Sequence, residues 1–134
     1  MYIGISTMLY EVSRSLDYLE KFDYMEKSGI KNIELSDVFN FQKNIIDAIN
    51  AQELSVFSMH AEYENADISS PDEEKRNNGI EDAIKRIGYL KKLNGKLLVI
   101  HPGGWYSDRK EKNIRINNCI SSLVHILNKA RMGN

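Results

Sequence analysis

Short apolar runs alternate along the chain with longer segments in which apolar residues recur every three or four positions. The short runs, at 2–6, 30–35, 54–59 and 96–100, have the length and composition typical of strands. The longer segments have the spacing of amphipathic helices and lie at about 15–29, 40–52 and 70–95, with a last one from about 108 onward. The pattern therefore predicts four strand–helix units in succession.

The connections between the predicted strands are long enough to bring each strand back parallel to the one before it. Right-handed crossovers place every helix on the same side if the strands are laid down in order. The predicted fold class is therefore α/β, a parallel (βα)4 half of a TIM barrel, with residues 1–134 as a single domain. A small doubly wound sheet is the alternative, but Thr7–Tyr10 lacks the glycine-rich phosphate turn of a dinucleotide fold.

Three details of the pattern make local predictions. The segment 70–73, Ser-Pro-Asp-Glu, indicates a helix start with Ser70 as the capping residue. The unbroken apolar run Leu97–Ile100 predicts a strand that is buried on both faces. The last helix is expected to bury one apolar stripe, which consists of Ile116, Ile120, Leu123, Val124 and Leu127.

Composition and charge narrow the class of protein. The formal net charge is −1 and no stretch is strongly basic, so nothing favours binding to nucleic acid. No run approaches the ~18 consecutive apolar residues of a membrane span, and the N-terminus shows neither a basic leader nor a cleavage site. We therefore expect a cytoplasmic protein that does not enter a membrane. The single cysteine, Cys119, has no activating neighbour and is expected to be an ordinary thiol.

Two of the three histidines occupy equivalent positions. His60 directly follows the strand at 54–59, and His101 directly follows the strand at 96–100. In a parallel barrel the active site lies at the carboxyl ends of the strands, and neighbouring strands are about 5 Å apart. The two imidazoles could therefore share one metal ion, and the alternative is that each is an ordinary polar residue with satisfied hydrogen bonds. The third, His125, has polar helical neighbours and is expected to face solvent.

Three short motifs together resemble a known superfamily. They are Ser58-Met59-His60-Ala61-Glu62-Tyr63, Ile68-Ser69-Ser70-Pro71 and Ile100-His101-Pro102-Gly103-Gly104. A His-x-x-Tyr stretch after the third strand, a Ser-Pro helix start and a His-Pro-Gly after the fourth strand are similar to the xylose-isomerase-like TIM barrels. That superfamily includes the sugar phosphate isomerases/epimerases and AP endonuclease family 2, the endonuclease IV type. The two histidines are 41 positions apart, which suits this arrangement.

The resemblance implies roles for four residues. His60 and His101 match histidines that bind zinc in the endonuclease IV branch, so they are the expected ligands of a divalent metal, Zn or Mn. In the isomerase/epimerase branch most metal ligands and acid–base glutamates come from later strands, and these histidines would lie near substrate hydroxyls. Glu34 matches a carboxylate at the end of the second strand and is expected to bind substrate, or else to pair with a lysine. Trp105 would stack on a sugar or cover the barrel mouth; the nucleases often have a further histidine there.

The resemblance covers only the first half of the family's length, and a complete barrel needs about 250 residues. The leading function is the N-terminal half of a metal-dependent sugar (phosphate) isomerase/epimerase-like protein, with a small sugar or polyol as substrate and no activity on its own. One alternative is an endonuclease IV-like AP endonuclease that acts on DNA phosphodiesters, and the other is a non-catalytic oligomerising half-barrel. No catalytic residue is assigned, and whether this chain is itself an enzyme stays open.

Half a barrel would have two unpaired strand edges and one uncovered sheet face. Exposed apolar surface is unfavourable by about 25 cal/mol per Å². We therefore expect the chain to self-associate, for instance as a two-fold dimer that rebuilds a closed or sandwiched barrel.

Overall fold

The computed structural model describes residues 4–7, 18–36, 43–61, 66–103 and 109–132. Their contacts group into two compact units: unit 1 comprises 1–60 and 88–99, and unit 2 comprises 61–87 and 100–134. We describe each unit by itself. The interpretation of 1–134 as one domain stays a prediction.

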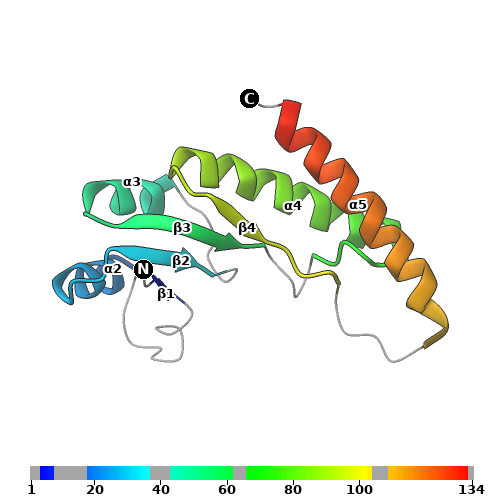
Figure 1. Ribbon diagram of the computed structural model, residues 1–134, viewed down its shortest axis with the longest axis horizontal. Coiled ribbons are helices and arrows are strands. Elements are labelled where there is room, and N and C mark those ends of the chain that lie inside the picture. The colour runs from blue at the N-terminus through cyan, green and yellow to red at the C-terminus, as the bar shows by residue number, and fades with distance from the viewer. Residues whose placement is uncertain (1–3, 8–17, 37–42, 62–65, 104–108, 133–134) are drawn as a thin grey trace. The chain divides into compact units, whose positions relative to one another are not determined.

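Unit 1 is built on a four-stranded parallel sheet (Figure 1). The strands lie side by side in chain order and are β1 (Gly4–Ser6), β2 (Asn32–Leu35), β3 (Ser55–His60) and β4 (Leu97–Val99). All three neighbouring pairs are parallel, which confirms the predicted order and direction. Phe57 is an extra residue in β3, because it lies between the residues that pair with Ile33 and Glu34.

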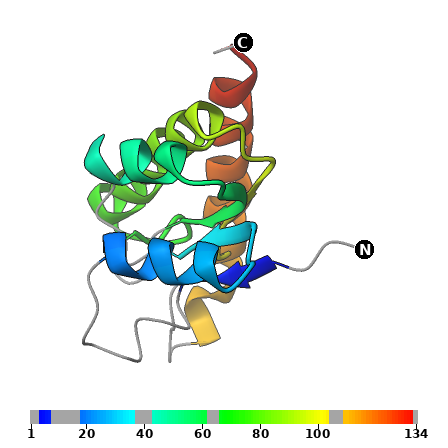
Figure 2. The same cartoon turned by 90° about the vertical axis from the view of Figure 1, so that its left-hand side faces the viewer.

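One face of this sheet holds the core of unit 1. The helices α2 (Tyr18–Lys27) and α3 (Lys43–Ala51) lie next to each other in unit 1 (Figure 2). Alternate strand residues and one side of each helix supply the core side chains, among them Phe22, Met25, Ile33, Leu35, Ile45, Ile49, Val56 and Met59. Burying a side chain of this size contributes about 1.5–3 kcal/mol, so these contacts determine which face of each strand turns toward the helices.

Residues in the left-handed conformation end two of the helices. Gly29, with φ of +76°, follows α2, and the Ile30 amide donates to the Met25 carbonyl at 3.0 Å. This is the helix end that the glycine predicts. Asn94, with φ of 54°, follows the third described helix, α4 (Glu73–Lys92), and the next amide, that of Gly95, donates to Leu90 at 2.9 Å.

The start of α4 differs from the prediction. Asp72 is the capping residue, since its Oδ1 accepts a hydrogen bond from the Lys75 amide at 3.1 Å. The prediction of Ser70 as the cap is wrong, because its hydroxyl accepts from the Asp72 amide at 3.2 Å and so belongs to the turn before the helix. The carboxylate of Asp72, two positions after Ser70, is the group that reaches the third amide of the helix, that of Lys75.

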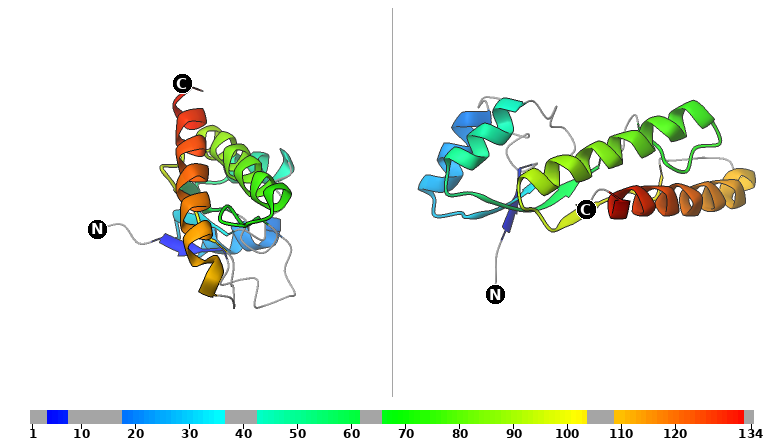
Figure 3. Two further views of the ribbon diagram at one scale, coloured as in Figure 1. Left: turned by 90° about the vertical axis from the view of Figure 1, so that its right-hand side faces the viewer. Right: turned by 90° about the horizontal axis from the view of Figure 1, so that it is seen from above.

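The longest described helix, α5 (Lys112–Met132), lies in unit 2 after a 3-10 turn, η1 (Arg109–Glu111). Figure 3 shows α5 as one uninterrupted rod. Its buried residues are Ser122 and Ile126, whereas the predicted stripe is largely open to solvent: Ile116, Ile120, Val124 and Leu127 are 46–57% exposed. The expectation that this stripe is buried is therefore wrong, because polar contacts to other parts of unit 2 set the orientation of α5. Within the described ranges no helix is both long and apolar enough to cross a membrane.

The opposite face of the sheet, which we name the open face, explains a second difference. The side chain of Leu97 in β4 is 50% exposed, so the prediction of a strand buried on both faces is wrong. Phe57 in β3 is 57% exposed. Both residues line a hollow over the sheet. The core cluster of unit 1 covers the other face of the strands, which is why apolar residues on the open face stay accessible.

Candidate functional site

Three polar side chains come together on the open face of unit 1. Glu34 is the third residue of β2, and Ser58 is its direct partner in β3. His60 is two residues further along β3, on the same side of the strand, because side chains alternate between the faces of a sheet. All three therefore lie toward the carboxyl ends of parallel strands, which is where ligand sites of parallel α/β barrels are built.

The carboxylate of Glu34 lies between a hydroxyl and an imidazole. The Ser58 hydroxyl donates to Glu34 Oε2 at 2.7 Å. The other oxygen, Oε1, lies 3.4 Å from His60 Nε2, and the side chains of Glu34 and His60 are 29% and 27% exposed. Since each side chain is less than a third exposed, their attraction is screened less than that of a surface pair. A ligand can nevertheless still reach both of them.

Buried contacts at the ends of β1 and β2 hold the backbone near Glu34. The Thr7 amide donates to the Glu34 carbonyl at 2.9 Å. Thr7 Oγ1 accepts from the Ser36 amide at 3.0 Å, and both side chains are almost fully buried. The sequence reasoning assigned no site role to Thr7 or Ser58. For Ser58 a signal was present, because a serine two positions before His60 in an apolar strand must point to the same side.

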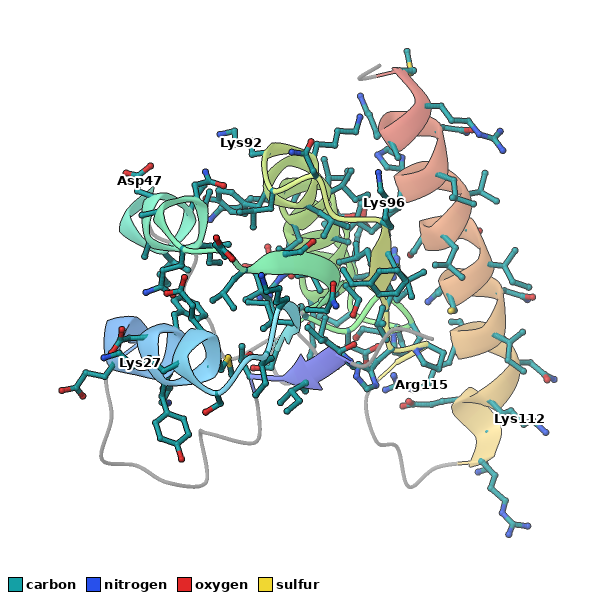
Figure 4. The ribbon with its side chains drawn as sticks, turned by 60° about the vertical axis from the view of Figure 1, so that its left-hand side comes forward. Lys27, Asp47, Lys92, Lys96, Lys112 and Arg115 are labelled. Atoms are coloured by element: carbon teal, nitrogen blue, oxygen red, sulfur yellow. The ribbon has the colours of Figure 1, made fainter. Side chains whose placement is uncertain are left out.

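The open face is hollowed. The hollow has a volume of about 900 Å³, and Glu34, Ser58, Phe57 and Lys96 are among the residues that line it. Figure 4 shows Lys96 at the start of the segment that forms β4. Small-molecule sites commonly have volumes of about 300–1,000 Å³ and combine apolar walls with a few polar groups. The hollow therefore has the size and the mixed lining of a site for a small polar ligand.

The other predicted site residues lie outside this cluster. His101 is exposed, two residues beyond the end of β4, and belongs to unit 2. The sharing of one metal by His60 and His101 therefore stays a prediction. Trp105 lies outside the described residues. His125 is exposed on α5, as predicted. Glu34 contacts Ser58 and His60, and its alternative pairing with a lysine stays a prediction.

The donor atoms of the cluster suit a divalent metal in part. Zn²⁺ and Mn²⁺ accept imidazole nitrogen and carboxylate oxygen, which His60 and Glu34 supply side by side. A catalytic zinc ion usually has three protein ligands. No group of three or more His, Cys, Asp or Glu side chains within the described ranges could hold a metal ion. The cluster thus fits a metal by the chemistry of its donors and contributes at most two of the required ligands.

A second polar cluster lies in unit 2 and fixes α5. Asp67, 4% exposed, accepts hydrogen bonds from the amide and the hydroxyl of Ser69 at 2.9 and 2.7 Å and pairs with Arg115 at 2.8 Å. Figure 4 shows Arg115 and Lys112 on the first turns of α5. Burial, and to a smaller extent the charge of Asp67, raise the pKa of the nearby Cys119 thiol. The thiol is therefore less acidic than usual, in agreement with its interpretation as an ordinary cysteine.

Comparison with solved structures identifies the fold. The chain is similar to a D-tagatose 3-epimerase-like protein (TM-score 0.78, 19% identity, 98% of this chain and 49% of that one). It is also similar to D-psicose 3-epimerase from Clostridium cellulolyticum H10, solved with D-tagatose (TM-score 0.72, 17% identity, 98% and 49%). A third is the TTHB071 protein from Thermus thermophilus, soaked with ZnCl2 (TM-score 0.69, 17% identity, 98% and 51%). Neither a family model nor a curated protein matches the sequence.

The three matches cover similar shares of the two chains compared. Nearly the whole of this chain is matched, yet it spans only about half the length of each solved structure. Four parallel strands in chain order, each connected to the next through a helix, are half of the eight units that a TIM barrel contains. The chain therefore has the fold of one half of a TIM barrel, as in the matched half of each of these sugar epimerases.

Proposed function

We propose that the chain is the N-terminal half of a metal-dependent sugar (phosphate) isomerase/epimerase-like protein of the cytoplasm, in which the open face of unit 1 binds a small sugar or polyol. The observation that carries the proposal is the cluster of Glu34, Ser58 and His60 beside the hollow of the sheet. The matched epimerases support it at the level of fold.

Each residue of the cluster has a chemical task in this proposal. Glu34 accepts a hydrogen bond from a sugar hydroxyl through Oε1, since Ser58 already donates to Oε2. His60, with His101, is a ligand of a divalent ion, Zn or Mn, and Trp105 stacks on the apolar side of the sugar ring. When bound, the metal would polarise the sugar carbonyl and so acidify the neighbouring C–H group.

The proton-transfer groups of such a reaction are not assigned to this chain. None of the cluster residues is identified as the general base that would remove a proton from carbon. Because the chain spans about half of the solved epimerases, turnover is proposed for a complete barrel and binding alone for this half. The endonuclease IV-like alternative rests on the resemblance of His60 and His101 alone, and a net charge of −1 gives little attraction for DNA phosphates.

Metal binding by purified chain tests the proposal. Titration calorimetry with Zn²⁺ and Mn²⁺ should give binding that His60→Ala weakens at least about tenfold, the order of effect of losing a ligand or its close partner. His125→Ala is the matched control, because that histidine is exposed on α5 and should leave binding unchanged. Equal metal affinity in the two variants would refute the ligand role.

Sugar binding is the second test of the proposed function. Trp105 is the only tryptophan in the chain, so its fluorescence reports on this part of the proposed site alone. Addition of D-tagatose or D-psicose should change the emission of the wild type, and Glu34→Gln should shift the midpoint to higher sugar concentration. If neither sugar changes the emission or protects the chain against thermal unfolding, the proposed substrate class is wrong.

A further inference from the structure

A buried polar cluster within unit 2 ties the segment 67–69 to the first turns of α5. Its members are Asp67, Ser69 and Arg115, and we name it the Asp67 cluster. Arg115 Nη1 donates to Asp67 Oδ2 at 2.8 Å and to Ser69 Oγ at 3.3 Å. The Ser69 hydroxyl in turn donates to Asp67 Oδ1 at 2.7 Å, and Asp67 and Ser69 are each 4% exposed. A buried network whose members satisfy one another in this way is rigid.

The backbone of Gly103 lies directly against this cluster. A methyl group on Gly103 would overlap Ser69 Oγ and would lie 2.8 Å from Ser69 Cβ and 3.1 Å from Asp67 Oδ1. Gly103 also has φ of 157°, a conformation that residues with a side chain rarely adopt. Pro102 and Gly103 line a hollow of about 300 Å³, so part of their surface faces open space. The contact with Ser69 and Asp67 is therefore a point at which this segment is held.

Pro102 carries the position of Gly103 over to His101, which is exposed to solvent. The proline ring fixes its own φ, and its Cδ restricts the preceding residue to extended conformations. Of the soft torsions that link the Cα atoms of His101 and Gly103, only ψ of Pro102 keeps its full range. The two Cα atoms are at most about 7 Å apart. A fixed Gly103 therefore leaves the backbone of His101 little freedom.

We propose that Asp67, Ser69 and Arg115 are positioning residues for His101. They hold the backbone of Gly103, and the stiff segment 101–103 then fixes the backbone from which the imidazole of His101 extends. This inference rests on the proposed function in taking His101 as a ligand of the divalent ion. A ligand that is held in place before binding loses less conformational freedom when it binds. The Asp67 cluster thus serves the site as well as the stability of unit 2.

Backbone order parameters from ¹⁵N relaxation test the anchoring without any metal. In the wild type the amides of His101 and Gly103 should have order parameters near about 0.85, the value of a rigid backbone, and Gly103→Ala should lower them below about 0.6. Ile126→Val is the matched control, because Ile126 is buried in the same unit about three turns further along α5. This control should lower the Tm and leave both order parameters unchanged.

A double variant separates the contact from the backbone strain at Gly103. Ser69→Gly removes the Oγ and Cβ atoms that the added methyl group would meet. If the contact matters, Gly103→Ala should lower the Tm less in the Ser69→Gly background than in the wild type. Equal losses in the two backgrounds would assign the whole effect to the φ of Gly103 and would overturn the role of the cluster.

Metal affinity connects the anchor to the site. At a temperature at which circular dichroism shows every variant folded, Gly103→Ala should raise the dissociation constant for Zn²⁺ at least about tenfold, the effect of losing a partner that orients a ligand. Ile126→Val should leave it unchanged. If Gly103→Ala does not fold, Ser69→Ala takes its place with the same expectations, because it removes only the hydroxyl that donates to Asp67.

Two results would overturn the inference. One is a Gly103→Ala variant with the order parameters of the wild type, and the other is a variant with lowered order parameters and the Zn²⁺ affinity of the wild type. A wild type that binds no Zn²⁺ refutes the proposed function instead, and the order parameters then decide the anchoring by themselves.

Discussion

Removal of the Arg115 side chain should strongly destabilise unit 2. Arg115 is the cation for Asp67, which is 4% exposed, and its own side chain is only 14% exposed. The Arg115→Ala variant leaves Asp67 with the amide and hydroxyl of Ser69 as donors but without an opposite charge. A buried carboxylate in that situation has lost its solvation by water and its ion pair together.

The size of the effect follows from this geometry. Breaking a buried ion pair from one side costs about 3–5 kcal/mol. The two donors of Ser69 remain, so we expect the lower end, about 3 kcal/mol. Glu111, the other carboxylate on Arg115, has a side chain that is 41% exposed, so Glu111→Ala should cost only about 0.2–1 kcal/mol. Arg115→Ala removes the contacts with both carboxylates, whereas Glu111→Ala removes only the more exposed of the two contacts. The two variants therefore form a matched pair.

A double variant tests the cause of the loss. Asp67→Asn removes the charge but keeps an oxygen that can accept from Ser69. If the uncompensated charge is what destabilises Arg115→Ala, the double variant Asp67→Asn/Arg115→Ala should be more stable than Arg115→Ala alone. A double variant that is less stable than Arg115→Ala would show that lost packing, and not the buried charge, dominates.

Thermal and urea unfolding followed by far-UV circular dichroism measure these differences. A loss of about 3 kcal/mol lowers the Tm of a chain of this length by about 10 °C. Hydrogen exchange locates the loss, which should be concentrated in the amides of 109–132. The reasoning is refuted if Arg115→Ala and Glu111→Ala unfold within about 2 °C of each other.

Two further predictions concern Cys119 and the glycines. Because burial and the charge of Asp67 raise the pKa of Cys119, the rate of alkylation by iodoacetamide should rise with pH through a midpoint above that of a free cysteine, and a lower midpoint would contradict the burial. A methyl group at Gly103 would meet the Ser69 hydroxyl and Asp67, whereas one at Gly88 in α4 has open space. Gly103→Ala should therefore lower the Tm, and Gly88→Ala should stabilise by up to about 1 kcal/mol; equal shifts in the melting curves would refute this contact.

The sequence was sufficient to predict the strands, their order and most helix ends. Short apolar runs and helical spacing are local signals, and Gly29 predicts the end of α2 through its own backbone preference. Register is not local. The closeness of Glu34 to Ser58 and His60 depends on the extra residue Phe57 in β3, and nothing in the composition of that strand reveals such a bulge.

The orientation of α5 escaped prediction for a different physical reason. Periodicity reveals that a helix has an apolar side, but not which surface covers that side. The side of α5 that faces the rest of unit 2 contains Arg115, Asn118 and Ser122. Such a polar interface leaves no hydrophobic pattern in the sequence. The cap of α4 is a similar case, since Ser70 and Asp72 are both good caps and only the geometry of the turn selects between them.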